Sequence, residues 1–462
     1  MSAAAPLSLR HDPIPLLVRR ISLPVSVGMF FQTMYNVVDT WAAGRLSTEA
    51  LAALAASFPV FFLIIAVAHG CQSATNALIS HAIGREDEET AKELAGQALF
   101  FASWMSLLTG VFGWWASPWF FELMRVEPAV SELGVSYTRT LFWVTPCFAI
   151  GSTFNGMLSA RGNTRPFRNA LIGGFLLNIV FDLWFVFGGL GLPPMGFAGI
   201  ARATALLQGV SVTYLWIMTV REGLIPPTGF AHLHPRLRVQ LRLIHQGFPA
   251  LINMLTIAAG IFLYTFYAVQ VGTTVAAAYG TGTRIEQLAL LPTIGLNTAA
   301  MTLSGHSYGA GRLNRLRETF FVCLRQGAWI CAAGAPIVAV FAPFWMRRFS
   351  SDPEVIEMGV AFLRIAMITL YAFVILFTGT SVLQGLQRPA FAIWVGVLRQ
   401  IVFPILLIPQ LMIRMPRPEL GIWWGAVIST WAGALITLAY LAWTWQKLKK
   451  EFSGTPAPAS SL

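Results

Sequence analysis

Charged residues are scarce in this chain. Asp, Glu, Lys and Arg make up 11% of the 462 residues, whereas hydrophobic residues make up 56%. A water-soluble domain carries roughly a quarter charged residues, so this composition excludes an ordinary soluble protein. Apolar runs of about 20 residues recur along the chain and are long enough to cross a membrane as helices.

Cysteine is rare as well, and its four positions argue against a disulfide framework. All four lie within apolar segments, which predicts small apolar fillers rather than disulfide partners: Cys71, Cys147, Cys323 and Cys331. The first 13 residues are polar and rich in Pro, and the first apolar run has the full length of a membrane span. We therefore expect no cleavable signal peptide.

Acidic residues are fewer than basic ones, 20 against 31, which gives a net charge of +11. Nucleic-acid binding is one reading of this excess, but membrane topology explains it better because cytoplasmic loops collect Arg and Lys. The predicted loops on the N-terminal side hold most of them, among them Arg85, Arg161, Arg165, Arg312 and Lys449. This predicts cytoplasmic N and C termini, membrane lipids as surroundings and no nucleic-acid partner.

The sequence is written twice. Gly70 to Gly84 returns as Gly295 to Gly309, Pro24 returns as Pro249, and the segment from Asn178 to Asp182 returns as Gln400 to Pro404. Gly199 and Thr204 return as Gly425 and Thr430. All the offsets lie close to one another, so an internal duplication is the natural explanation. A duplicated membrane protein with polar groups in its apolar segments is typical of a transporter.

The predicted fold is an all-α polytopic membrane protein. Twelve transmembrane helices are expected near 20–44, 50–79, 93–116, 134–158, 167–188, 198–220, 243–270, 277–304, 319–345, 357–384, 390–410 and 420–446. They divide into an N-lobe (1–220), a cytoplasmic linker (221–242), a C-lobe (243–446) and a disordered cytoplasmic tail (447–462). Six spans per copy predict two six-helix lobes related by a pseudo-two-fold axis along the membrane normal.

Two acids lie inside apolar spans of the first copy. Asp39 follows Tyr-Asn-Val-Val in the first span, and Asp182 follows Asn178 by four residues in the fifth. An ionised carboxylate at the bilayer centre costs about 3 kcal/mol on insertion scales, so such an acid meets a proton, a cation or water. A charge state that depends on ions is what a coupling site requires. The alternative is a structural carboxylate that caps a broken helix or pairs with an Arg.

The two acids have polar neighbours in the expected spans. Asn178 shares a helix face with Asp182, and Asn36 and Gln32 precede Asp39 by three and seven residues. Asn155 and Thr204 come from the fourth and sixth spans. Carboxylate, amide and hydroxyl oxygens can hold a hard cation or relay protons. Because Pro404 replaces Asp182 in the second copy and an aromatic stretch replaces Asp39, the ion chemistry is expected in the first copy alone.

Other candidates have roles around this site. Pro24 is a candidate for helix bending, with a static kink as the alternative, because its repeat partner Pro249 suggests a shared architectural role. Glu286, Tyr264 and Tyr267 are candidates for the substrate cavity of the second copy. Arg202 and Arg399 lie within spans and are candidate partners for the acids.

These motifs resemble the multidrug and toxic compound extrusion (MATE) family of cation-coupled antiporters over residues 15 to 446. The resemblance rests on Ser22-Leu-Pro24, the segment from Gln32 to Thr40, the two Gly-bounded copies, Gly162 to Pro166, and Asn178 with Asp182. It implies a transporter, not an enzyme, that exchanges amphipathic, often cationic drugs for H⁺ or Na⁺. The implied ion site is Asp39, Asn178, Asp182 and Thr204, with Gln32 and Asn155 nearby. No cofactor is expected beyond the coupling ion, and a monomer in the bacterial inner membrane is expected.

Two other functions compete with this one. A lipid-linked oligosaccharide flippase of the same superfamily should line its cavity with Arg or Lys, whereas the first-copy cavity here should be acidic. An intramembrane aspartyl protease needs two facing acids, usually with Gly before one of them. Here Val38 and Phe181 precede Asp39 and Asp182, and the second copy would have no purpose.

Overall fold

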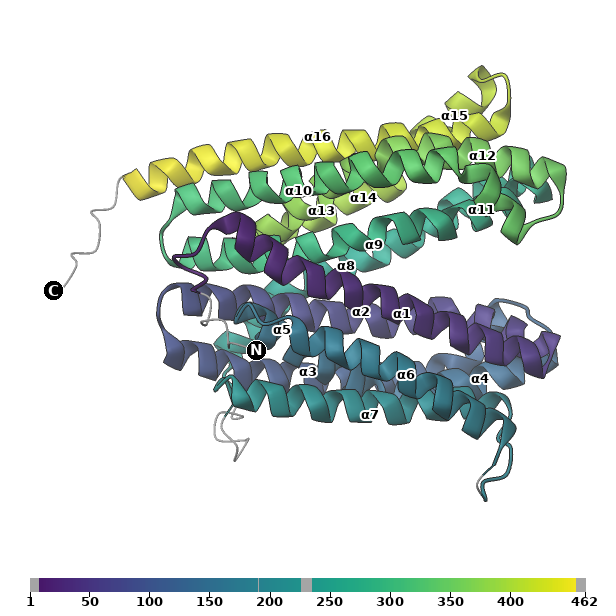
Figure 1. The fold of residues 1–462 in the computed structure, drawn as a ribbon, viewed down its shortest axis with the longest axis horizontal. Helices are drawn as coiled ribbons and strands as arrows, with labels where there is room; N and C mark the ends of the chain where they lie inside the picture. The colour runs from purple at the N-terminus through teal and green to yellow at the C-terminus, as the bar shows by residue number, and fades with distance from the viewer. Residues whose placement is uncertain (1–7, 190, 226–234, 454–462) are drawn as a thin grey trace. The chain divides into compact units, whose positions relative to one another are not determined.

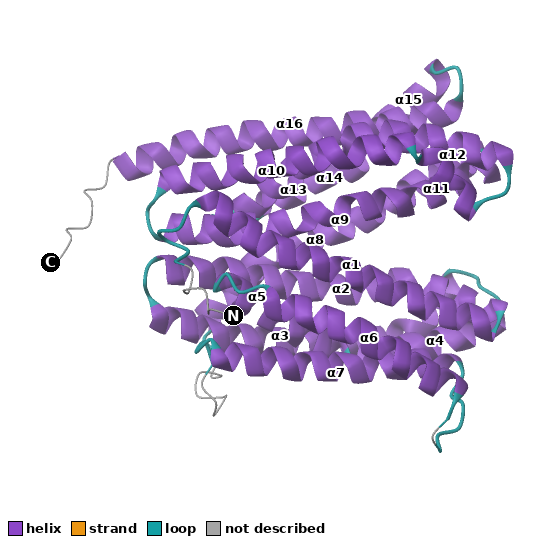
Figure 2. Ribbon diagram, in the orientation of Figure 1, coloured by secondary structure: helices purple, strands orange, loops and turns teal. Residues whose placement is uncertain are grey.

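The computed structural model describes residues 8–189, 191–225 and 235–453. Within these ranges the chain is helical apart from turns, short loops and one isolated β-bridge between Gly189 and Leu192 (Figure 2). Eleven of the described helices are long and apolar enough to cross a membrane, and a bent pair supplies a twelfth span. The predicted all-α fold with twelve spans is confirmed.

The helices follow the chain in the order shown in Figure 1. Their bounds are α1 (Ile14–Leu46), α2 (Thr48–Gly84), α3 (Glu88–Leu123), α4 (Pro128–Trp143), α5 (Thr145–Ala160), α6 (Arg165–Phe187), α7 (Phe197–Arg221), α8 (Leu237–Val271), α9 (Thr273–Gly309), α10 (Leu313–Val340), α11 (Ala342–Phe349), α12 (Pro353–Ala366), α13 (Leu370–Gly385), α14 (Ala390–Val397), α15 (Phe403–Arg414) and α16 (Pro418–Ser453). A 3₁₀ turn (Met367–Thr369) joins α12 to α13, and a π-helical turn (Leu398–Val402) joins α14 to α15.

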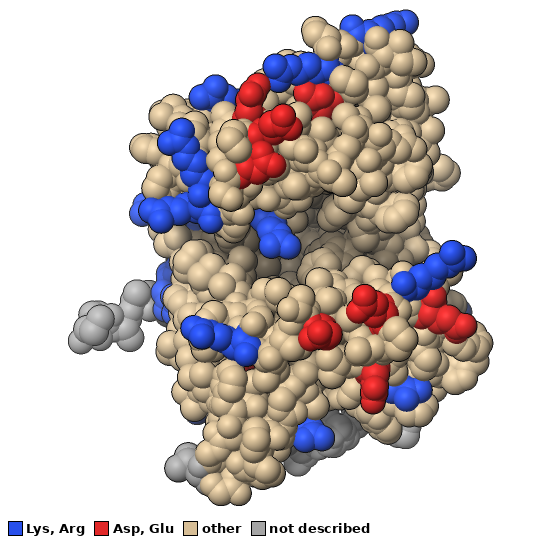
Figure 3. Space-filling view, turned by 90° about the vertical axis from the view of Figure 1, so that its right-hand side faces the viewer, with Lys and Arg blue, Asp and Glu red and all other residues tan. Residues whose placement is uncertain are grey.

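The outer faces of the helices are apolar, as a lipid environment requires. Large side chains that are more than half exposed occur in both copies, among them Leu107, Val111, Phe262, Trp329 and Ile337. A soluble monomer rarely exposes so much contiguous apolar surface. Figure 3 looks onto the helix ends at the right-hand side of Figure 1 and shows Lys, Arg, Asp and Glu side chains there. Charge therefore gathers where the helices leave the apolar layer.

Several helices begin at polar caps and run beyond the predicted spans. Asp87 caps α3 by accepting from the backbone N–H of Thr90 at 3.0 Å, and Asp352 caps α12 by accepting from that of Glu354 at 2.9 Å. The 33 residues of α1 measure about 50 Å, which exceeds the hydrocarbon thickness of about 30 Å. Hydropathy locates only the apolar middle of each helix, so the predicted bounds were too short.

Four of the predicted spans are interrupted, one of them (357–384) by the 3₁₀ turn between α12 and α13. The span expected at 134–158 is the pair α4 and α5, bent by 46° where Pro146 removes a backbone donor. The span expected at 319–345 ends at Val340, and its last residues enter the separate helix α11. The span expected at 390–410 contains the π turn, in which the N–H of Phe403 bonds the carbonyl of Leu398.

The predicted linker and tail are partly helical. Residues 237–242 of the expected linker begin α8, and residues 447–453 of the expected disordered tail complete α16. That part of the tail prediction was wrong, because α16 continues past the apolar layer through residues with high helix propensity such as Lys447 and Lys449. Residues 226–234 and 454–462 lie outside the described part.

Contacts divide the chain into two compact units. The first unit holds the described residues of Arg20–Ile79 and Asp87–Ala258. The second unit holds those of 259–453, together with 8–19 and Ser80–Glu86. These bounds differ from the predicted lobes because α1, α2 and α8 each contribute to both units. The N-terminal segment belongs to the second unit since Arg312 and Arg315 donate to the carbonyl groups of Arg10 and Asp12.

Each unit has its own apolar core. In the first unit, small residues such as Ala43 and Ala53 pack with Tyr137, Phe142 and Ile200. In the second unit, Tyr264, Tyr279, Phe362 and Trp423 form an aromatic group, and Tyr279 stacks on Trp423 with 5.8 Å between ring centroids. Large, rigid rings on several helices fix the spacing of those helices.

The two copies of the Gly-bounded repeat meet inside the second unit. A Cβ atom on Gly84 would lie 2.8 Å from Cα of His306, and one on Gly309 would overlap the carbonyl of His81. His81 and His306 occupy equivalent positions in the two copies of the repeat, and so do Gly84 and Gly309. The duplicated glycines therefore permit a reciprocal close approach of the ends of α2 and α9.

Candidate functional site

The buried polar cluster of the first unit comes from three helices. Asp39 lies in α1, Asn178 and Asp182 lie one turn apart in α6, and Thr204 lies in α7. Helix α7 packs against α6 along its length, and the backbone of Gly199 approaches that of Phe185 there. All four side chains are almost fully buried.

Asp39 and Asn178 are hydrogen-bonded to each other. The side-chain N–H of Asn178 donates to one carboxylate oxygen of Asp39 over 3.0 Å. The side-chain oxygen of Asn178 is buried and has no donor among the described residues. It therefore remains available as a ligand for a cation.

Asp182 is the most exceptional group of the cluster. Its side chain is 1% exposed, and neither carboxylate oxygen has a hydrogen-bond donor within the described part of the chain. Its carboxyl group lies within hydrogen-bonding reach of that of Asp39. Two facing buried carboxyls, of which only that of Asp39 accepts a described hydrogen bond, require a shared proton or a bound cation, because like charges repel and a buried unpaired charge is costly.

Tyr35 links this pair to α7. It precedes Asp39 by one helical turn, and its hydroxyl donates to the hydroxyl oxygen of Thr204 over 3.0 Å. The sequence prediction included Thr204 but missed Tyr35, although the spacing of four residues from Asp39 places both on one face of α1. Tyr137 of α4 was missed too. It interacts electrostatically with both acids, and its ring lies tilted against that of Phe197 with 5.3 Å between the centroids; nothing in its local sequence marks it.

The structure does not bring every predicted residue into contact with the acids. Asn155 is buried in α5, where it accepts a long bond of 3.4 Å from Ser159. Gln32 is partly exposed and Asn36 is exposed. No described hydrogen bond joins any of the three to Asp39 or Asp182. Helix α1 runs unbroken through Pro24, whose role in bending stays a prediction.

The candidates of the second copy lie apart from this cluster, in the second unit. Tyr264 is buried, Tyr267 and Glu286 are partly exposed, and Glu286 interacts electrostatically with Arg399. The predicted pairing of Arg399 with an acid thus has a candidate partner in Glu286. Arg202 is exposed, and its guanidinium contacts the sulfur of Met195 rather than Asp182.

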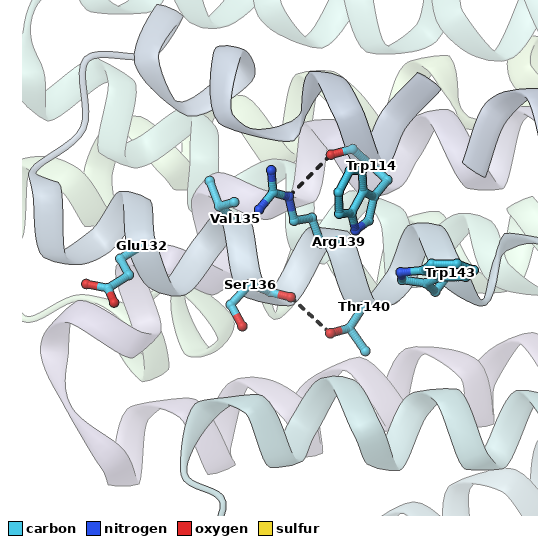
Figure 4. Close-up of a pocket in the computed structure, with 7 residues that line it drawn as sticks. All are labelled: Trp114, Glu132, Val135, Ser136, Arg139, Thr140 and Trp143. Atoms are coloured by element: carbon cyan, nitrogen blue, oxygen red, sulfur yellow. Dashed lines mark hydrogen bonds between the residues drawn. The ribbon is translucent and has the colours of Figure 1, made fainter. Parts of the chain in front are cut away.

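An open groove on the first unit is separate from the acid cluster. It measures about 560 Å³ and is lined by Trp114, Glu132, Val135, Ser136, Arg139, Thr140 and Trp143 (Figure 4). The guanidinium of Arg139 lies 4.5 Å from the ring centre of Trp114. Exposed Trp beside Arg is typical of the membrane interface. None of the predicted site residues lines this groove.

Twelve apolar spans define a polytopic membrane protein, and a pair of acids is buried within its first unit. The chain belongs to the MatE family. The family model matches twice, over residues 24–184 and 249–409. The double match confirms the internal duplication, and the family confirms the resemblance drawn from the motifs.

Similar proteins carry transport names. The chain is 25% identical to "Probable multidrug resistance protein YoeA" of Bacillus subtilis, with 96% of this chain and 97% of that protein covered. It is 23% identical to "Multidrug resistance protein PmpM" of Pseudomonas aeruginosa, with 96% and 94% covered. It is 24% identical to the "FAD transporter" of Shewanella oneidensis over 76% and 77% of the two chains.

Solved structures share the fold. One is described as "Outward-facing conformation of a multidrug resistance MATE family transporter of the MOP superfamily" and superimposes with a TM-score of 0.89. It is 24% identical, and the match covers 97% of this chain and all of the other. Another, with a TM-score of 0.89 and 23% identity over the same shares, is described as "Crystal structure of MATE in complex with MaL6".

Proposed function

We propose that this protein is a multidrug efflux antiporter that exports amphipathic, often cationic compounds in exchange for H⁺ or Na⁺. The observation that carries the proposal is the buried Asp182 carboxylate, which lacks any described donor and faces Asp39. Relatives named as multidrug resistance proteins support the cargo class. We further propose the bacterial inner membrane as location, cytoplasmic termini and a monomeric transporter.

The coupling ion is proposed to bind between α1, α6 and α7. The ligands would be Asp39, Asp182, the free side-chain oxygen of Asn178 and the hydroxyl of Thr204. This all-oxygen donor set suits a hard cation such as Na⁺, and the facing carboxyls equally suit a shared proton. The acidic first copy favours efflux over the flippase hypothesis. The facing acids meet one requirement of the protease hypothesis, but relatives named as multidrug resistance proteins support drug efflux instead.

Exchange follows from the charge of this site. When the acids take up H⁺ or Na⁺ from outside, their net charge falls and their attraction for a cationic drug weakens. The drug leaves to the outside. The transporter then changes from an outward-open to an inward-open state, and the ion is released inside. Each elementary charge that moves down the membrane potential supplies about 2.3 kcal/mol per 100 mV.

Ethidium uptake into everted vesicles, which corresponds to efflux from the cell, tests this function under separate pH and Na⁺ gradients. We expect one gradient to drive efflux by the wild type and neither to drive it in the Asp39→Asn/Asp182→Asn double variant. The matched control is Asp352→Asn, a cap acid outside the cluster. Gradient-driven efflux that persists undiminished in the double variant would contradict the proposal.

Tyr35→Phe should weaken coupling without abolishing it. The variant leaves the buried Thr204 hydroxyl without its donor. Loss of this hydrogen bond costs about 1 kcal/mol, which corresponds to about a fivefold fall in the gradient-driven efflux rate. Thr204→Val removes the same hydrogen bond and a proposed ion ligand, so its loss should be larger, and the Tyr35→Phe/Thr204→Val double variant should lose no more than Thr204→Val alone. Initial rates of ethidium efflux measure this cycle. Additive losses would show that the two hydroxyls act independently.

A further inference from the structure

The second copy has its own buried polar cluster where the first copy has the ion site. Tyr264 stands at the position of Asp39, Gln400 at that of Asn178 and Pro404 at that of Asp182. Gln400 is buried, and a Cβ on Gly260 would lie 3.1 Å from its Cβ and overlap its amide. The missing side chain of Gly260 therefore makes room for Gln400 in the second unit.

Two opposite charges enter this cluster from positions with no charged counterpart in the first copy. Glu286 comes from α9, and Arg399 comes from the π turn between α14 and α15. The two attract each other, yet their nitrogen and oxygen atoms lie beyond the 4.0 Å of a direct ion pair. Glu286 remains partly exposed, whereas Arg399 is 5% exposed.

The guanidinium of Arg399 is held in place by rings rather than by acceptors. It lies 5.1 Å from the ring centre of Phe373 and 5.9 Å from that of Phe377, both on α13. Its Nε atom is buried and has no partner among the described residues. A planar guanidinium that is fixed on aromatic faces can donate two parallel hydrogen bonds from its remaining N–H groups to a carboxylate or phosphate.

The surroundings of Glu286 are rigid and aromatic. Glu286 interacts electrostatically with Tyr264 and Tyr279. These two rings lie 6.3 Å apart, and Tyr279 stacks further on Trp423. Aromatic faces beside a carboxylate suit a flat organic cation, which gains from the rings as well as from the charge.

We propose that Glu286 and Arg399 form a bipolar recognition site that binds amphipathic zwitterions, with the cationic group at Glu286 and the anionic group at Arg399. A purely structural ion pair would close to direct contact, whereas these two charges are separated and Arg399 keeps an unpaired donor. An anion alone would be repelled by Glu286, and a cation alone would leave Arg399 unpaired. The inference rests on the proposed efflux function and names residues that set its substrate selectivity.

A matched pair of dyes tests this site. Rhodamine B is a zwitterion at neutral pH, and its ethyl ester is a cation of nearly the same shape. Gradient-driven efflux of both is measured in everted vesicles for wild type, Arg399→Gln, Glu286→Gln and the double variant. Arg414→Gln, at the exposed end of the same span, is the control.

We expect Arg399→Gln to raise the half-saturating concentration of rhodamine B about tenfold or more, because a buried charge partner is lost, and to leave the ester unaffected. Glu286→Gln should weaken both dyes. The double variant lacks both recognition groups, so it should export both dyes more weakly than the wild type and with no discrimination between them. An unchanged ratio of the two dyes in Arg399→Gln overturns the proposal, and so does a double variant that still discriminates between the dyes as the wild type does.

The outcome for the wild type separates this inference from the proposed function. If the wild type exports the ester but not rhodamine B, efflux stands and the zwitterion site fails. If no gradient drives export of the ester by the wild type, the proposed function itself fails.

Discussion

Gradient-driven ethidium efflux is expected to fall about 100-fold in Asp182→Asn. A loss of this size corresponds to the upper part of the range of about 1–3 kcal/mol that is typical of a coupling free energy between two sites. The reason is that neither carboxylate oxygen of Asp182 has a described donor, so this side chain is left to interact with Asp39, with the neighbouring Asn178 and with the ion. An amide at this position cannot bind a proton and attracts a cation far less. Initial rates in everted vesicles under the coupling gradient measure the loss.

Asp39→Asn should reduce gradient-driven ethidium efflux less than Asp182→Asn does. An Asn at position 39 keeps an oxygen that can accept from Asn178, so the local hydrogen bond survives. Asp182→Glu retains the charge on a longer arm and should keep part of the activity. Binding of ethidium to the purified Asp182→Asn protein serves as the control for folding. Equal losses in the two Asn variants would contradict the assignment of Asp182 as the principal ion-binding group.

Gly199→Ala is expected to destabilise the protein by about 1–3 kcal/mol and to impair coupling, because overpacking forces the backbone to shift. A Cβ there would lie 2.8 Å from the backbone carbonyl of Phe185, so α7 would have to move away from α6. That movement carries Thr204 away from Tyr35. Thermal unfolding in detergent at a fixed scan rate, together with ethidium efflux, measures both effects.

Gly209→Ala is the matched control on the same helix. A Cβ at Gly209 meets nothing within 4 Å, so the substitution should raise the melting temperature, with a gain of up to about 1 kcal/mol from helix propensity. Efflux should stay at the wild-type level. A stable, fully coupled Gly199→Ala protein would show that the contact between α6 and α7 does not position the site.

The membrane fold followed from the sequence because composition and duplication both constrain it. Runs of apolar residues located all twelve spans, and the double match of the family model confirms the repeat. Helix ends and breaks were harder to predict. Pro146 marks the bend between α4 and α5, and Pro404 lacks the N–H that would bond the carbonyl of residue 400, but the sequence does not show that this break takes the form of a π turn at Leu398–Val402.

The acid cluster was predictable to the extent that charge inside an apolar span is informative. Helix periodicity predicted only that Asn178 and Asp182 share a face, and the family resemblance implied that Asp39 joins them; the structure places Asp39 beside both. Tyr137 was not predictable, because its place beside the acids results from tertiary packing of α4. Asn36 shares a helix face with Asp39 at three-residue spacing, yet it is exposed while Asp39 is buried. Periodicity groups residues on a face but does not say how far around the helix the burial extends.

The reciprocal approach of Gly84 to His306 and of Gly309 to His81 has the form of a homodimer interface within one chain. Identical subunits related by a two-fold axis contact each other in this isologous way, with residue i on j and j on i. Each glycine therefore leaves room for the backbone of the histidine in the other copy, and a larger residue at either glycine would clash there. The two copies have diverged at Asp182 and Pro404, but at the ends of α2 and α9 they still make the same glycine–histidine contact in both directions.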